Sequence, residues 1–213
     1  MVNKDKIKKG ARLILEGIGE DPSRQSIIET WERRVPEMYE TLSEGYRDEN
    51  KPSMKDFKTQ NKNIVIKTDI PIYSLCEHHL LPYFGIINIA YKPRNNVVGL
   101  SKLARYIRWK SRRITMQEEL TSDIAEGLRD ETGAEYVLVT IEATHLCECM
   151  RGIEQESQTR TIATSGTSPD DKDQILHTVI GNREGSLIER SQPSPPIHKI
   201  PLSILYEYSN TIP

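Results

Sequence analysis

Two clusters of cysteine and histidine, far apart in the sequence, carry residue types that bind transition metals. Cys76 and His79 stand at the spacing C-x-x-H, so one tight turn aims a thiolate and an imidazole at the same point. Cys147, in the second cluster, supplies a third ligand. Three protein ligands leave one position of a tetrahedral zinc ion open for water, which is typical of catalytic zinc. Zinc is favoured over iron because mixed thiolate and imidazole ligands suit it.

The simpler interpretation of each cluster is structural. Buried cysteine is an ordinary core residue, and a single C-x-x-H is weak by itself. His78 and His145 adjoin the proposed ligands, and two interpretations of them stay open. They either support the ligands or the core, or they act as general acid and base, because imidazole titrates near neutral pH.

A third group of residues is suited to an anion. Ser101, Lys102 and Arg105 fall at the start of a predicted helix, where Lys102 and Arg105 share a face. We expect Ser101 to cap this helix, and its hydroxyl with the two cations resembles a phosphate site. A solvated basic face is the commoner situation, and it is what we expect of the neighbouring Arg108, Lys110, Arg112 and Arg113.

Gln117 and Glu118 together offer an amide and a carboxylate. Such a pair suits the edge of a purine, since the carboxylate accepts hydrogen bonds from an amino group and a ring N–H. Charged helix surfaces contain many such pairs, so the dipeptide alone indicates nothing.

Composition limits the classes of function. The chain has 213 residues, with 29 Lys and Arg against 31 Asp and Glu, a balance that argues against general nucleic-acid binding. Its three cysteines all lie in the two clusters, which favours metal binding in a reducing compartment over a disulfide framework. We expect neither a signal peptide nor a membrane span, and predict a cytoplasmic protein.

The hydrophobic periodicity predicts an α+β fold. Helical spacing covers 6–18, 24–46 (interrupted by Pro36), 101–113 and 115–132, and Gly133 is a fitting stop. Strand spacing covers 64–72, 83–92, 135–144 and, more weakly, 158–165. Two strands, two helices and two strands predict an antiparallel sheet with both helices on one face. We divide the chain into an N-terminal helical region (1–62), a catalytic domain (63–168) and a C-terminal extension (169–213), in which 173–180 suits a short helix.

Several segments together resemble GTP cyclohydrolase I in order and separation. They are CEHHL at 76–80, GLSKLAR at 99–105, QE at 117–118 and EATHLCECMRG at 142–152, and DPSRQ at 21–25 is also similar. The resemblance covers roughly residues 6–166, and beyond Gly166 the chain departs from the usual ending of the family.

This resemblance implies a tunnelling fold (T-fold) that assembles as a decamer of two pentamers, with active sites between subunits. It implies conversion of GTP to 7,8-dihydroneopterin triphosphate and formate, the first step of pterin and folate biosynthesis.

The resemblance also implies a role for each site residue. Cys76, His79 and Cys147 would bind Zn²⁺, while His78, His145 and Ser101 would be catalytic. Gln117 and Glu118 would hold the guanine, and the triphosphate would contact Lys102, Arg105 and Arg151, with Arg33 contributed by a neighbouring subunit.

Two alternatives stay open. One is a paralogue with an altered product or a role in specialised metabolism. The other is a catalytically silent regulatory homologue that keeps a structural zinc ion, which a fourth ligand such as Cys149 would favour.

Overall fold

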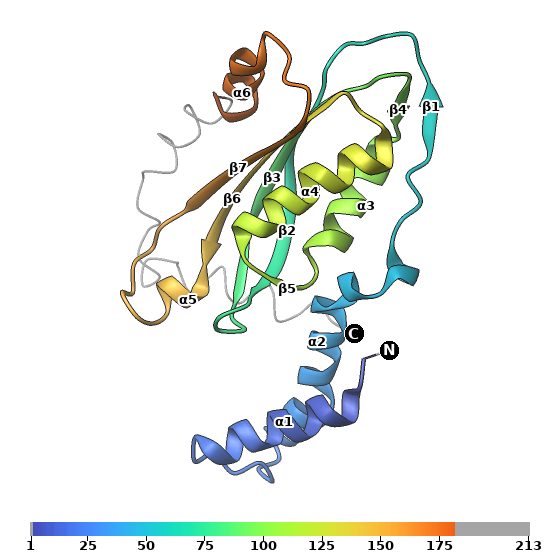
Figure 1. The fold of residues 1–213 in the computed structure, drawn as a ribbon. Helices are drawn as coiled ribbons and strands as arrows, with labels where there is room; N and C mark the ends of the chain where they lie inside the picture. The colour runs from blue at the N-terminus through green and yellow to red at the C-terminus, as the bar shows by residue number, and fades with distance from the viewer. Residues whose placement is uncertain (1, 182–213) are drawn as a thin grey trace, which may run out of the picture. The chain divides into compact units, whose positions relative to one another are not determined.

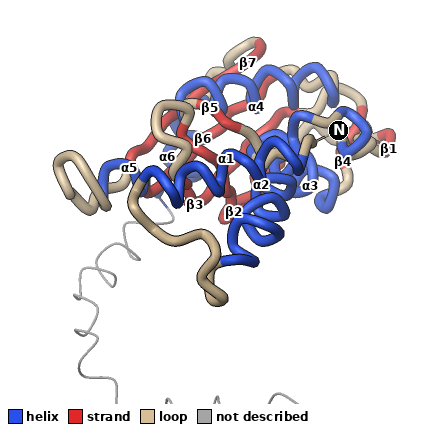
Figure 2. The backbone as a smooth tube through the Cα atoms, turned by 90° about the horizontal axis from the view of Figure 1, so that it is seen from below, coloured by secondary structure: helices blue, strands red, loops and turns tan. Residues whose placement is uncertain are grey.

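The computed structural model describes residues 2–181. The chain contains both α-helices and β-strands (Figure 2). The α-helices are α1 (Lys4–Gly17), α2 (Val35–Leu42), α3 (Leu100–Ser111), α4 (Gln117–Thr132), α5 (Leu146–Cys149) and α6 (Lys172–Gly181). Within the described part of the chain, no helix has the length and apolar character that a membrane crossing needs.

A five-stranded sheet in the order β5-β2-β3-β6-β7 forms the centre of the fold (Figure 1). Its strands are β2 (Val65–Cys76), β3 (Pro82–Lys92), β5 (Ile114–Thr115), β6 (Tyr136–His145) and β7 (Thr159–Gly166). The four long strands are antiparallel neighbours, and the short β5 runs parallel to the end of β2. The predicted antiparallel sheet is confirmed, with β2 extended as far as Cys76.

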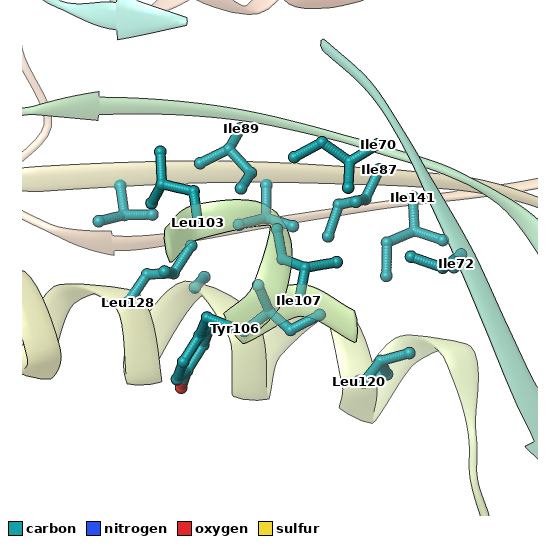
Figure 3. Close-up of a cluster of buried hydrophobic side chains, with 14 of the residues drawn as sticks. Ile70, Ile72, Ile87, Ile89, Leu103, Tyr106, Ile107, Leu120, Leu128 and Ile141 are labelled. Carbon is teal, nitrogen blue, oxygen red and sulfur yellow. The ribbon is translucent and has the colours of Figure 1, made fainter. Parts of the chain in front are cut away.

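The main hydrophobic core lies between this sheet and the helices α3 and α4 (Figure 3). Ile87 and Ile141 point from the strands, and they meet Ile107 of α3 and Leu120 of α4. All four are at most 1% exposed. The apolar residues recur with the helical period in α3 and α4 and at alternate positions in β3 and β6. These patterns therefore place the apolar side chains of the helices and strands in one shared core, as the sequence predicts.

The opposite face of the sheet is partly covered by α6. Ile175 and Val179 of this helix pack on Tyr136 and Leu138 of β6, and all four are buried. The predicted helix at 173–180 is thus confirmed, and it forms a second, smaller core.

Helix boundaries correct two expectations. Gly99 is the N-cap of α3, and no side chain caps the helix there, so Ser101 lies inside the first turn. The α4 helix begins at Gln117, because Thr115 belongs to β5 and Met116 is the N-cap. Gly133 ends α4 with a positive φ of 63°, a conformation that glycine adopts without steric cost.

The expected helix over 24–46 is shorter, and the backbone is helical without a break from Ile28 to Leu42. Its middle is a π-helical turn, Thr30–Arg34, which passes directly into α2. Pro36 stands in the first turn of α2 but inside this continuous helix, so the π-helical turn before it accommodates the missing N–H of the proline. Short 3₁₀ turns follow at Glu44–Tyr46 and Asp48–Asn50.

The connection from the N-terminal helices to the sheet contains a further strand. It is β1 (Asp56–Lys58), which pairs antiparallel with β4 (Asn96–Val98) in a separate two-stranded sheet.

Three of the four basic residues expected to form a solvated face are engaged elsewhere. Arg113 donates to the carbonyl oxygen of Gly45 at 2.7 Å, and Lys110 pairs with Asp123 at 2.9 Å. The Arg112 side chain is only 15% exposed. Arg108 alone keeps an exposed side chain, although it too pairs with Glu44. The contacts with Glu44 and Gly45 attach the segment before the sheet to the end of α3, and the pair of Lys110 and Asp123 joins α3 to α4, which is why the simple basic-face interpretation is wrong here.

Candidate metal and nucleotide site

The candidate residues converge because several elements end at the same end of the sheet. Cys76 is the last residue of β2, and His145 is the last residue of β6. Cys76 is in register with Thr115 of β5, two residues before α4 begins. The α5 turn follows His145 directly and carries Cys147. Strand ends and one helix start therefore bring together residues that are 71 positions apart.

A tight hairpin turn sets the first two candidate ligands. The Leu80 N–H donates to the carbonyl oxygen of Cys76 at 2.8 Å, and the Cys76 N–H donates to that of Leu81 at 2.9 Å. Leu80 adopts a positive φ of 55°, which is uncommon for a bulky residue and costs conformational energy. This turn places the ring of His79 beside the Cys76 sulfur.

The ligand atoms of Cys76, His79 and Cys147 lie within 4.8 Å of one another. The Cys76 Sγ is 3.7 Å from the Cys147 Sγ and 3.7 Å from the His79 Nδ1. Zn–S bonds of about 2.3 Å and Zn–N bonds of about 2.0 Å at tetrahedral angles give edges of roughly 3.5–3.8 Å. The spacing and the donor types therefore fit a zinc ion. Cys149, also on α5, is not a member of the cluster.

Burial makes the Cys147 thiol poorly acidic without a cation. Burial, followed by the hydrogen bond and charge of Cys76, raises the pKa of the Cys147 thiol. A metal ion reverses this effect, because coordination favours the thiolate.

Two polar side chains flank the cluster. The Nδ1 of His78 lies 3.9 Å from the Cys76 Sγ, and the side chain of His78 is 61% exposed. Arg151 contacts the outer nitrogen of His79, with its Nη1 at 2.6 Å from Nε2.

His145 is held more firmly than His78. Its Nε2 lies 2.7 Å from the Oε1 of Gln117. Its ring stacks on Tyr83, with centroids 4.6 Å apart and planes within 9°. Burial lowers the pKa of His145 below its ordinary value of 6.5, while the charges of Glu118 and Glu148 partly oppose this shift.

The residues expected to bind the guanine differ in exposure. Glu118 is exposed at the start of α4, whereas the adjacent Gln117 is only 1% exposed. Sequence alone did not distinguish them, because both fit a helix start. The structure shows that only Glu118 presents its polar group at the surface.

The candidate anion-binding residues lie around the start of α3. Ser101 and Arg105 are exposed, and Lys102 contacts the Oγ of Ser53 at 3.5 Å. Arg105 and Trp109 line a cavity of about 420 Å³ beside α3. Arg33 lies in the π-helical turn and pairs with Glu29 and Glu37 of its own segment, each at 3.0 Å.

Tyr83 was missed by sequence reasoning. In the sequence, Tyr83 looks like one more apolar residue of a strand. Its contact with the site depends on the register of β3 against β6. Tyr83 and His145 are directly opposed on β3 and β6. The signal was therefore present only in the pairing of two strands, which the sequence pattern did not specify.

Comparison with known proteins places these residues in a family. A family model described as GTP cyclohydrolase I matches residues 7–179. The GTP cyclohydrolase 1 of Hyperthermus butylicus is 44% identical over 165 residues, covering 78% of this chain and 83% of that protein. The GTP cyclohydrolase 1 of Finegoldia magna is 42% identical over 174 residues, covering 81% and 94%. That of Caldanaerobacter subterraneus is 45% identical over 169 residues, covering 78% and 89%. The match includes most of α6, so the expected departure beyond Gly166 is wrong for the residues up to Val179.

Proposed function

The chain belongs to the GTP cyclohydrolase I family, and on that premise we propose that it hydrolyses and rearranges GTP to 7,8-dihydroneopterin triphosphate and formate. The observation that carries this proposal is the cluster of Cys76, His79 and Cys147 beside His145 at one end of the sheet. The reaction opens the imidazole ring of the purine at C8, a poor electrophile, and so requires a strong nucleophile near neutral pH.

We propose zinc as the metal and the three clustered side chains as its ligands. When bound, zinc lowers the pKa of water and supplies a hydroxide-like nucleophile at neutral pH. The sulfur and nitrogen spacing supports this assignment, as does the donor set. Since Cys149 is not part of the cluster, the described residues offer three ligands rather than a closed set of four. An open position favours catalysis over the alternative of a silent structural zinc.

The remaining side chains would bind the substrate and move protons. His145 and His78 are the proposed acid and base. The Nδ1 of His78 lies 3.9 Å from the Cys76 sulfur, and His145 ends the strand that leads directly into α5 with its Cys147. Ser101 would contact the sugar. Exposed Glu118 would accept hydrogen bonds from the amino group and ring N–H of guanine. The adjacent Gln117 is buried.

The triphosphate requires several cations, and we propose Lys102, Arg105 and Arg151, with Arg33 from a second subunit. Lys102 and Arg105 lie on the first turns of α3, where the helix dipole also favours an anion. Arg151 lies next to the metal cluster through its contact with His79.

We also propose the T-fold and a ring assembly, a decamer of two pentamers. Two strand edges support this. In the described part of the chain β7 pairs only with β6, and the outer side of β2 pairs only at Leu75 and Cys76, with β5. Open strand edges are templates for pairing with another chain. Joining the β2 edge of one subunit to the β7 edge of the next would continue the sheet around a ring.

We place the enzyme in the cytoplasm, because its ligand thiols must stay reduced. The three cysteines are free in the structure. The proposed partners are GTP and further copies of this chain, and we propose neither a nucleic acid nor a membrane as a partner.

The direct test is incubation of the zinc-loaded oligomer with GTP. We expect formate, together with a product that becomes fluorescent as neopterin after oxidation, at the mass of 7,8-dihydroneopterin triphosphate. Absence of turnover by a zinc-replete oligomer would count against the activity. A product that stops at a ring-opened intermediate would instead identify a paralogue with an altered product.

A further inference from the structure

The buried side chain of Gln117 forms hydrogen bonds at both its amide nitrogen and its amide oxygen. Its amide nitrogen, which carries two hydrogens, lies within hydrogen-bond distance of three acceptors: the carbonyl oxygens of Thr159 at 3.0 Å and Ile141 at 3.3 Å, and the Oγ1 of Thr161 at 3.1 Å. Its Oε1 lies 2.7 Å from the Nε2 of His145. With 1% of its surface exposed, this amide has little left to offer a substrate.

The orientation of the amide follows from its partners. Backbone carbonyl oxygens only accept hydrogen bonds, so the NH₂ group of Gln117 must face Thr159 and Ile141. The opposite orientation would place an oxygen against two carbonyl oxygens, one buried and one partly buried, and acceptors that face each other away from water are costly. The amide oxygen therefore faces His145 and accepts a hydrogen bond from Nε2.

Tyr83 fixes the plane of the same ring. It is 0% exposed, and its ring lies parallel to that of His145 within 9°. The two residues are cross-strand partners of β3 and β6, so the stacking follows from the register of the sheet. The His145 ring is held by stacking on its face and by a hydrogen bond at one nitrogen. It therefore has little freedom to rotate or to flip so that Nδ1 and Nε2 change places.

We propose that Gln117 is a positioning residue, which together with Tyr83 holds the His145 ring with its hydrogen on Nε2 and leaves Nδ1 as the nitrogen that meets the substrate. This inference rests on the proposed function for its meaning in catalysis. It assigns to Gln117 a task other than holding the guanine edge, and it leaves that edge to Glu118.

The neighbouring pair Gln117 and Glu118 makes the inference testable. A positioning residue affects turnover more than binding, whereas a residue that reads the purine edge affects binding. We choose Gln117→Met, which keeps the length of the side chain and removes both hydrogen-bonding groups. Thr161→Val is the matched control, because it removes one partner of the amide nitrogen but leaves Oε1 and His145 in place.

The first measurement is independent of activity. In the full-length protein labelled with ¹⁵N-histidine, we expect one ring N–H at the Nε2 of His145 that is protected from solvent exchange. Loss of the signal in His145→Gln identifies it among the five histidines of the chain. The protected signal should persist in Thr161→Val and disappear in Gln117→Met. Its absence from the unsubstituted protein, or its persistence in Gln117→Met, would overturn the proposal. If Gln117→Met does not fold, the spectrum of the unsubstituted protein still tests the proposal, because absence of the protected signal there would overturn it.

The second measurement separates positioning from purine recognition. For Gln117→Met we expect turnover at saturating GTP to fall at least tenfold, while the dissociation constant for 8-oxo-GTP stays within threefold. Glu118→Gln should instead weaken 8-oxo-GTP binding at least tenfold. Weakened binding in Gln117→Met with unchanged turnover would show that Gln117 reads the guanine. If the protein does not act on GTP at all, the protected ring N–H still reports on the contact itself.

Discussion

The two halves of the proposed site, one for the metal and one for the triphosphate, are built in different ways. The metal-binding half comes from strand ends, a hairpin turn and the start of α4, and its side chains already contact one another. The anion-binding half comes from the first turns of α3, Arg151 and the π-helical turn, and its cations are exposed or paired within the chain. Arg33 is held by two carboxylates of its own segment, and Arg151 contacts a histidine.

This difference indicates where preorganisation resides. Cys76 and His145 are fixed by strand register and burial, and His79 by the tight turn after β2, so the geometry of these groups exists without substrate. The cations would acquire their arrangement from the phosphates themselves or from a second subunit. Reacting groups require sub-ångström placement, whereas a highly charged triphosphate draws exposed cations to it.

Cys147→Ala should produce the largest effect, because it removes one of three ligands from the preorganised half. We expect loss of stoichiometric zinc and a fall in activity of about 10³-fold or more, since metal-activated water supplies several kcal/mol to the reaction. Zinc content by mass spectrometry and neopterin fluorescence measure the two results. Cys149→Ala, on the same short α5 helix, is the control and should keep both zinc and activity. A Cys147→Ala protein that retains full zinc would refute the ligand assignment.

Arg105→Ala tests the anion-binding half and should act on affinity rather than on the metal. We expect the KM for GTP to rise about tenfold, the size of one hydrogen bond between charged groups, with zinc content unchanged. Arg108→Ala is the matched control on the same helix, because Arg108 is already engaged by Glu44 at 3.1 Å. Equal effects of the two substitutions would indicate a general electrostatic contribution instead of a defined phosphate contact.

The sequence predicted the parts of this site that depend on residue type and local period. The C-x-x-H turn, the antiparallel strands and the α6 helix all follow from short-range patterns, and these predictions agree with the described structure. The contacts that distinguish Gln117 from Glu118 depend on how α4 is rotated against β6 and β7. Ser101 failed as a cap because the turn at Gly99 starts α3 two residues earlier. Long-range register and helix rotation are not encoded in local periodicity, so these features could not be predicted.

Substitutions of Tyr83 compare the contribution of its stacked ring to stability with the contribution of its hydroxyl group. Its hydroxyl is buried without a hydrogen-bond partner among the described residues, and burial keeps its pKa well above the ordinary value, so the phenol stays neutral. Tyr83→Phe keeps the ring beside His145 and should change unfolding free energy by no more than about 1 kcal/mol. Tyr83→Leu removes the stacked ring and leaves a cavity, and should cost about 2–3 kcal/mol. Urea denaturation at fixed protein concentration compares the two variants. Equal losses would show that the ring itself contributes little.

The smallest expected effect concerns the pH dependence of the metal-free fold. Burial lowers the pKa of His145 in the folded state below 6.5, so the unfolded chain binds the proton more readily. Stability must therefore rise with pH between the folded pKa and 6.5, and fall as acid is added through that window. His145→Gln, which cannot titrate, should remove this component. As the pH falls from 7 to 5, the urea midpoint of the unsubstituted protein should therefore decrease relative to the urea midpoint of His145→Gln. A difference that is constant with pH would mean that His145 titrates alike in both states. The metal-binding half would then be less closed to solvent than its contacts with Gln117 and Tyr83 indicate.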